Sequence, residues 1–340
     1  MRTLFRLSVL TLSAALLAAC GGESGGDAQE VILYTARHYD SDELINRRFE
    51  EETGIAVRSI SADSDLLIER IRADGARSPA DVVMTVDAGR LYRAEQAGLF
   101  QPVQSDILDS RIPASLRHPD GLWFGFSRRA RVFVYAKDRV QPGELGGYET
   151  LADPALRGRV CVRSSGVIYN ISLLAALIDR WGPDRAQDWA DGVVANFARI
   201  PSGADMDQIL AVRAGECDVA LVNHYYFARL IASDPTITDT VAIHWPEAGG
   251  GVHVNISGAG VAAGAPHPEA AVRYLEFLAS DEAQRMVAET NGEYPVEADV
   301  EYDNPIIAEF GTFEADPLNV SVLGENQAEA QRMFDRAGWP

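Results

Sequence analysis

Short apolar runs alternate with amphipathic segments along most of the chain after residue 30. Several runs, such as DVALV, are apolar at nearly every position, which is typical of parallel strands covered on both faces. Between them, apolar positions recur at helical spacing, as in the segment 41–53, which ends before Gly54. The pattern predicts an α/β fold with mostly parallel sheets.

The predicted strands are 31–36, 56–60, 81–86, 123–126, 132–136, 159–162, 218–222 and 241–245. The predicted helices are 41–53, 65–73, 88–97, 171–181, 204–214, 226–232 and one long helix, 268–290. Two further runs, WFGFSRRARVFVYA, broken near Ser127, and VHVNISGAGVAA, are candidates for strands that cross between lobes. A chain that leaves one lobe and later returns needs two such crossings, and they would form a hinge.

The first twenty residues predict an export signal, because two arginines precede an apolar run that is too short to span a bilayer. The ending LAAC resembles a bacterial lipobox, in which Cys20 would be lipidated. The alternative is an ordinary cleaved signal with an incidental cysteine. Residues 21–28 are predicted to form a flexible tether. We therefore expect a periplasmic protein, anchored to a membrane through an N-terminal lipid.

The chain has 340 residues and a formal net charge of −20, and loss of Arg2 and Arg6 with the signal would change this to −22. Nucleic-acid binding is excluded as a function, since phosphate contacts need a basic surface. The mature length exceeds a usual single core, so two domains are expected. We expect the protein to be a monomer.

Two cysteines, Cys161 and Cys217, remain after the signal in an oxidising compartment. Each precedes a strand–helix junction that carries a tyrosine. If the two strands are neighbours, the Cα atoms lie within bridging range and a disulfide forms. The alternative is a pair of buried free thiols.

Four tyrosines follow predicted strands where helices begin. Tyr39 follows VILYTA, Tyr169 follows GRVCVRS, and Tyr225 and Tyr226 follow DVALVN. In open α/β sheets ligands bind at this end of the strands, so the four phenols are expected in one pocket. A phenolate is a hard anionic oxygen donor, favoured by a helix N-terminus. The best-suited ligand is a hard, highly charged cation, and ferric iron is the leading candidate.

The motifs RHYDSDEL, SRRARVFVY, CVRSSGVIYNISLLAALI, ECDVALVNHYYFARL, VNISGAGVAAGAPHPEAA and GEYPV occur in this order. Together they resemble the ferric-iron-binding solute receptors of bacterial ABC transporters, over nearly the whole mature chain. The likeness is closest to the tyrosine-rich branch that needs no bound anion. It implies a two-lobed type II periplasmic-binding fold with hinge strands and a ligand cleft. It also implies delivery of Fe(III) to an ABC permease.

From the chain order, residues 29–126 and 256–305 are predicted to form lobe one, and 127–255 and 306–340 lobe two. The resemblance places Tyr39, Tyr169, Tyr225 and Tyr226 at the ligand positions and His38 at the rim or as a ligand. It also places Arg129 and Arg229 close behind. Some relatives add a glutamate ligand where this chain has Ser61, so a carboxylate from that loop is not expected.

Charge balance gives the arginines a role. Four phenolates around a trivalent ion leave one excess negative charge, which a permanently charged guanidinium can offset. Arg129 and Arg131 share one strand face, and Arg229 lies one helical turn beyond Tyr226. Ordinary ion pairs between the lobes are the alternative role. His224 is expected to point away from the metal.

Three questions stay open at this point. The first is the oxidation state of the bound iron, because phenolate sites also hold the ferrous ion. A receptor for an organic cation or an oxyanion is a second, since the same fold carries such solutes. An iron-dependent enzyme is a third, but catalysis needs open coordination positions that four or five protein donors would fill. We therefore expect a binding protein that is not an enzyme.

Overall fold

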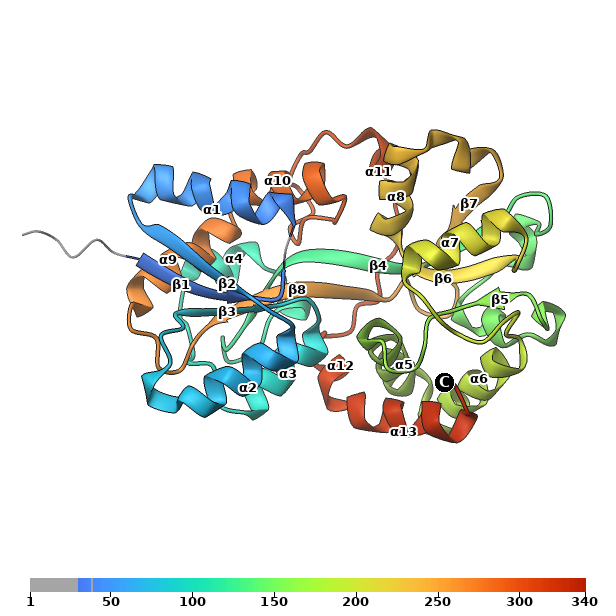
Figure 1. Cartoon of the computed structure of the whole chain (residues 1–340), viewed down its shortest axis with the longest axis horizontal. Coiled ribbons are helices and arrows are strands. Elements are labelled where there is room, and N and C mark those ends of the chain that lie inside the picture. Colours follow the sequence, from blue (N-terminus) through green and yellow to red (C-terminus); the bar gives the residue numbers. More distant parts are fainter. Residues whose placement is uncertain (1–29, 38) are drawn as a thin grey trace, which may run out of the picture.

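The computed structural model describes residues 30–37 and 39–340. The predicted signal, Cys20, the tether and His38 lie outside the described residues. Two lobes lie side by side, and two long strands, β4 and β8, run between them (Figure 1). Within the described part of the chain, no helix has the length and apolar character needed to cross a membrane.

The strands are β1 Glu30–Thr35, β2 Ala56–Ser61, β3 Val82–Thr85, β4 Phe124–Ala136, β5 Val160–Cys161, β6 Val219–Asn223, β7 Val241–His244 and β8 Val254–Val261. The helices up to residue 195 are α1 Asp40–Thr53, α2 Ser64–Asp74, α3 Ala88–Gln96, α4 Asp106–Arg111, α5 Ile168–Trp181 and α6 Pro183–Ala195. The remaining helices are α7 Asp205–Ala214, α8 His224–Ser233, α9 Pro268–Leu278, α10 Asp281–Asn291, α11 Pro305–Glu309, α12 Val322–Glu325 and α13 Gln327–Ala337.

The strands form one continuous, mixed sheet in the order β2-β1-β3-β8-β4-β6-β5, with β7 paired to β4. Strand β1 pairs in parallel with β2 and β3, and β5 pairs in parallel with β6. Every pairing of β4 and β8 is antiparallel. The prediction of mostly parallel sheets is therefore wrong. The crossing strands run against their neighbours in both lobes, which apolar content alone does not reveal.

Strands β4 and β8 pair with each other where the lobes meet. The break predicted near Ser127 is present as a shift of register between Gly125 and Ser127. Gly258 of β8 lies tightly against β4, and a Cβ there would be 2.6 Å from the carbonyl oxygen of Phe124. Only glycine permits this approach, which accounts for the GAG motif.

The helical predictions need two corrections. The long helix predicted over 268–290 is divided into α9 and α10, because Ser280 starts a new helix by accepting a hydrogen bond from the Ala283 N–H (3.3 Å). Helices α4, α6, α11, α12 and α13 were not predicted at all. Helix α6 begins with Pro183, a recognisable start signal directly after Gly182.

The core has three parts. One fills lobe one, from Val31 to Phe126 with β8, α9 and α10. The other two lie on opposite faces of the lobe-two sheet, so Phe133 belongs to one and Val132 to the other. Leu323 of α12 joins the lobe-one core, whereas α13 packs in lobe two. The segment after residue 305 thus contacts both lobes, and the boundaries drawn from the sequence stay a prediction.

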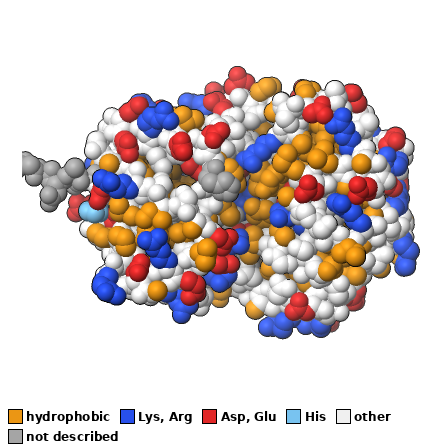
Figure 2. Space-filling view, viewed as in Figure 1, with side chains coloured by type: hydrophobic (Ala, Val, Ile, Leu, Met, Phe, Trp, Pro, Cys, Tyr) orange, Lys and Arg blue, Asp and Glu red, His pale blue; other side chains and the backbone are white. Residues whose placement is uncertain are grey.

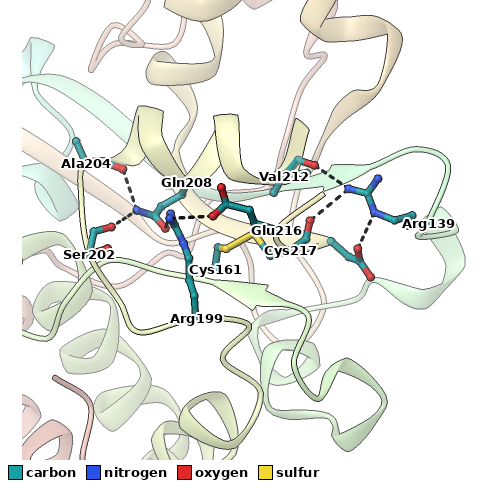
Figure 3. The surroundings of a disulfide bond; sticks show 10 residues. Arg139, Cys161, Arg199, Ser202, Ala204, Gln208, Val212, Glu216 and Cys217 are labelled. Atoms are coloured by element: carbon teal, nitrogen blue, oxygen red, sulfur yellow. Dashed lines mark hydrogen bonds and ion pairs between the residues drawn. A yellow bond between two sulfur atoms is a disulfide. The ribbon is translucent and has the colours of Figure 1, made fainter. Parts of the chain in front are cut away.

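Cys161 and Cys217 are joined by a disulfide, with their Cα atoms 5.9 Å apart. Cys161 ends β5 and pairs with Ala220 of the neighbouring β6, and Cys217 lies just before β6 (Figure 3). The bond therefore ties the two strands that lead towards Tyr169 and the Tyr225–Tyr226 pair. Both cysteines are buried.

Replacement of both cysteines by serine is expected to lower the free energy of unfolding by about 2–4 kcal/mol, because the bond closes a long loop. The measurement is denaturant unfolding of the variant and of the oxidised wild type, with the reduced wild type as a further comparison. Equal midpoints for all three proteins, or two free, alkylatable thiols in the mature protein, would contradict the prediction.

Candidate metal centre

The four predicted tyrosines stand where strands meet helices. Tyr39 precedes α1 as its N-cap, and its backbone N–H donates to the Asp42 carboxylate (3.0 Å). Tyr169 is the second residue of α5. Tyr225 and Tyr226 are the second and third residues of α8. Each position follows from the end of an apolar strand and the start of an amphipathic helix, as the sequence predicted.

The phenol rings gather around two arginines. The rings of Tyr225 and Tyr226 are tilted against each other at 4.3 Å. The guanidinium carbon of Arg229 lies 4.9 Å from the Tyr39 ring centroid and 5.0 Å from that of Tyr225. The guanidinium carbon of Arg129 lies 5.4 Å from the Tyr169 ring. Arg229 thus contacts phenols from both lobes, and Tyr169 is close enough to Tyr39 and Tyr225 to raise the pKa of each.

Burial is the main influence on the protonation of Tyr39, Tyr225 and Tyr226. Burial raises the pKa of Tyr225 well above its ordinary value, and Tyr169, Tyr39 and Tyr226 raise it further. Burial also raises the pKa of Tyr39 and of Tyr226. Without a cation these phenols are protonated at neutral pH. A cation that ligates these phenols would therefore have to displace their protons.

A cleft of about 620 Å³ opens beside Tyr169 and Tyr226. One wall is the lobe-one loop Ser61–Ser64, and the opposite wall is the turn before α5, with Arg163 and Gly166. On the face shown in Figure 2, apolar side chains gather where the lobes meet, while acidic and basic side chains intermingle elsewhere. Tyr169 and Tyr226 thus line a cleft between the lobes, whereas Tyr39 lines a separate pocket in lobe one.

The two carboxylates that follow β2 have partners of their own, although Asp63 also lines the cleft. Asp63 caps α2 by accepting a hydrogen bond from the Asp65 N–H (2.9 Å). Asp65 pairs with Arg93 at 2.7 Å. This agrees with the sequence interpretation, in which both carboxylates serve the loop and the helix start. Among the described residues, no three His, Cys, Asp or Glu side chains gather as a metal site.

Sequence reasoning missed the buried pair Arg37 and Glu293. Arg37 donates to Asp42 (2.9 Å) and to Glu293 (3.3 Å), and its guanidinium carbon lies 4.9 Å from the Tyr39 ring. Burial alone would lower the pKa of Arg37, but the charges of Asp42 and Glu293 raise it. The signal was present, since RHYDSDEL and GEYPV contain both residues, but no spacing rule connects positions 256 residues apart.

Arg129 has acidic neighbours besides the phenols. Its guanidinium lies 3.8 Å from Glu293 and 4.0 Å from Asp87. Asp87 also accepts a hydrogen bond from the Ser172 hydroxyl of α5 (2.8 Å). Burial raises the pKa of Asp87, whereas Arg129 lowers it. Arg129 therefore connects the phenols with an ion-pair network at the contact between the lobes.

His224 is fully buried, and both of its ring nitrogens are engaged. Nδ1 lies 3.2 Å from the Ala130 N–H, which donates to it, and Nε2 lies 2.8 Å from the Gly292 carbonyl oxygen. The ring links β4 to the segment after α10. As predicted, it is not available as a ligand.

His224 is expected to remain neutral in the folded protein far below pH 6, because burial lowers its pKa to about 3. The unfolded chain would bind that proton near the ordinary pKa of about 6.5, so stability is lost as the pH falls from there. The measurement is an NMR titration of the imidazole rings with unfolding curves across the same range. Protonation of His224 near its ordinary pKa in folded protein would contradict this.

The family model described as bacterial extracellular solute-binding protein matches residues 77–314. The chain belongs to this family of two-lobed binding proteins. It is 46% identical to iron uptake protein A2 of Synechocystis, over 99% of this chain and 98% of the relative.

Two solved structures extend the comparison. A Trichodesmium protein, IdiA or FutA in complex with iron and citrate, is 49% identical with a TM-score of 0.88, covering 92% of this chain and all of the other. The ferric iron-binding protein A of Mannheimia haemolytica, in an open conformation, is 36% identical with a TM-score of 0.86. That alignment covers 92% of this chain and 99% of the other.

Proposed function

We infer that this protein is a periplasmic receptor that captures Fe(III) between its lobes and delivers it to an ABC permease. The observation that carries the inference is the gathering of four phenols from two lobes around Arg129 and Arg229, beside a cleft that two of the phenols line. Phenolate oxygens suit a hard trivalent ion and would nearly fill its coordination. The family and the iron-binding relatives agree with this function.

The proposed donors divide between the lobes. Tyr169, Tyr225 and Tyr226 of lobe two hold the ion first, and Tyr39 of lobe one completes the site when the lobes close. Binding energy then favours the closed form, whose surface a permease can distinguish from the open form. His38 lies outside the described residues and stays a predicted additional ligand. The same donors also accept Fe(II).

Arg129 and Arg229 are proposed to offset the excess negative charge of four phenolates. The support is their placement against the phenol rings. Among the described residues Arg229 makes no ion pair, so its charge is available to the site. Arg131 differs, because it is fully buried and already paired with Asp205. We therefore give Arg131 a structural role.

A donor set that nearly fills the coordination of the ion leaves little room for a substrate, so we propose binding without catalysis. We also propose that the protein acts as a monomer and that Cys20 carries a lipid anchor to the membrane. An organic cation or oxyanion receptor is the alternative function, and it would not need three separate helix starts carrying tyrosine.

The test is a visible spectrum of the purified protein before and after addition of ferric iron. Phenolate ligation gives a charge-transfer band that saturates at one ion per chain, whereas an organic-solute receptor gives none. Absence of the band under conditions in which free ferric iron stays soluble would overturn the proposed function.

A further inference from the structure

A fully buried carboxylate, Asp205, lies between the two segments that carry the lobe-two tyrosines. It is the first residue of α7 and has no exposed surface. One carboxylate oxygen accepts hydrogen bonds from the Arg131 guanidinium and from the backbone N–H of Asn223 (3.0 Å). The other accepts a hydrogen bond from Arg163 (2.8 Å). Three segments distant in sequence are thus joined at one side chain.

The contact with Asn223 reaches the tyrosine pair. Asn223 is the N-cap of α8, and Tyr225 and Tyr226 follow within the first turn. Arg131 also donates to the side-chain oxygen of Asn223 (3.2 Å), so Asp205 and Arg131 hold this residue from two sides. Asp205 and Arg131 therefore add side-chain contacts to the pairing of β6 with β4, which together place the start of α8.

The contacts with Arg131 and Arg163 reach Tyr169. Arg131 donates to the side-chain oxygen of Asn170 (2.7 Å). The Asn170 amide in turn donates to the carbonyl oxygens of Arg163 (3.0 Å) and Ser164 (3.1 Å), which closes the turn before α5. The guanidinium carbons of Arg131 and Arg163 each lie 5.9 Å from the Tyr169 ring. The turn and the ring beside it therefore depend on Asp205.

We propose that Asp205 is the positioning residue of the metal centre, which sets the relative placement of Tyr169 and the Tyr225–Tyr226 pair. This rests on the proposed function, because it assigns those tyrosines as ligands. Burial of a carboxylate between two arginines carries a desolvation penalty, so such ion pairs contribute little to the free energy of folding. Its role here is to hold two donor-bearing helix starts in one arrangement, as partners of metal ligands do elsewhere.

The experiment compares Asp205→Asn with Asp207→Asn. The control removes the same charge from the same helix turn, but Asp207 is exposed and accepts only from the Ala204 N–H (2.7 Å) in the capping box. Asparagine at 205 cannot accept from both arginines and Asn223 at once. We expect ferric affinity to fall by about 10- to 100-fold in Asp205→Asn and to stay unchanged in Asp207→Asn.

The spectrum separates positioning from general destabilisation. If a lobe-two phenol no longer reaches the ion, the charge-transfer band of iron-saturated Asp205→Asn shifts and loses intensity per bound iron. A loss of stability alone leaves the band of the folded, saturated protein unchanged. Arg163→Met is the second variant, for use should Asp205→Asn fail to fold. It removes one of the hydrogen bonds to Asp205 by changing a partly exposed side chain. We expect the same change in the spectrum, smaller in size.

The outcomes are distinguishable. Wild-type protein without a ferric band overturns the proposed function, and the role of Asp205 with it. A wild-type band with unchanged affinity and spectrum in folded Asp205→Asn overturns the role of Asp205 alone. If Asp205→Asn does not fold, unchanged affinity and spectrum in Arg163→Met overturn it instead.

Discussion

Replacement of Tyr225 or Tyr226 by phenylalanine is expected to weaken ferric binding by at least about 100-fold, since even partners outside the ligand set cost about 10- to 100-fold. Each change removes one anionic oxygen and leaves the ring to pack. Tyr225 is almost fully buried against Tyr226, so water cannot simply replace its oxygen. The measurement is equilibrium competition with a chelator of known ferric affinity, together with the charge-transfer band.

The matched control is Tyr34→Phe. Tyr34 is fully buried in β1, and its hydroxyl has no hydrogen-bond partner among the described residues. This substitution removes a phenol hydroxyl of similar burial that lies away from the cleft, so ferric affinity should not change. If Tyr225→Phe and Tyr226→Phe both bind iron as the wild type does, the proposed donor set is wrong.

The positions of the four tyrosines could be predicted because they depend on local rules. An apolar strand followed by an amphipathic helix places the junction at the ligand-binding end of the sheet. Tyr39, Tyr169 and Tyr225 all follow this rule. The break in the first crossing strand was also visible, since the apolar run is interrupted by charged residues around Ser127.

The groups that hold the tyrosines in place could not be predicted, because their partners are distant along the chain. Glu293 meets Arg37 across 256 residues, and Asp205 meets Arg131 across 74. In the sequence each is a charged residue near a helix end, where a solvated surface position is the ordinary expectation. Only the folded arrangement shows that both carboxylates are buried between arginines.

The antiparallel strands were missed for a related reason. An apolar run indicates burial on both faces but not the direction of the neighbouring strand. Strand β8 is inserted between β3 of lobe one and β4, although it follows β7 in the chain. The antiparallel direction of β8 therefore follows from the return of the chain to lobe one. The return was predicted from the sequence, but the strand direction that it imposes on the sheet was not.

Ferric affinity is expected to rise steeply with pH. Burial raises the pKa of Tyr39, Tyr225 and Tyr226, so the metal-free phenols hold their protons at neutral pH. Each phenol that becomes a ligand must release one proton, so lowering the pH favours the metal-free form. The affinity should change by about tenfold per pH unit for every phenol that binds.

The measurement is chelator competition between about pH 6 and about pH 8, corrected for protonation of the chelator and for ferric hydrolysis. A count of protons released into weakly buffered solution gives the same quantity independently. Tyr39→Phe should release one proton fewer than the wild type, because its ring has no ionisable oxygen. Affinity that does not depend on pH would mean that none of the phenols ligates the ion. An equal proton count in Tyr39→Phe would mean that the phenol of Tyr39 alone does not. The proton count thus reports how many phenols bind, including the one that lobe one is proposed to supply.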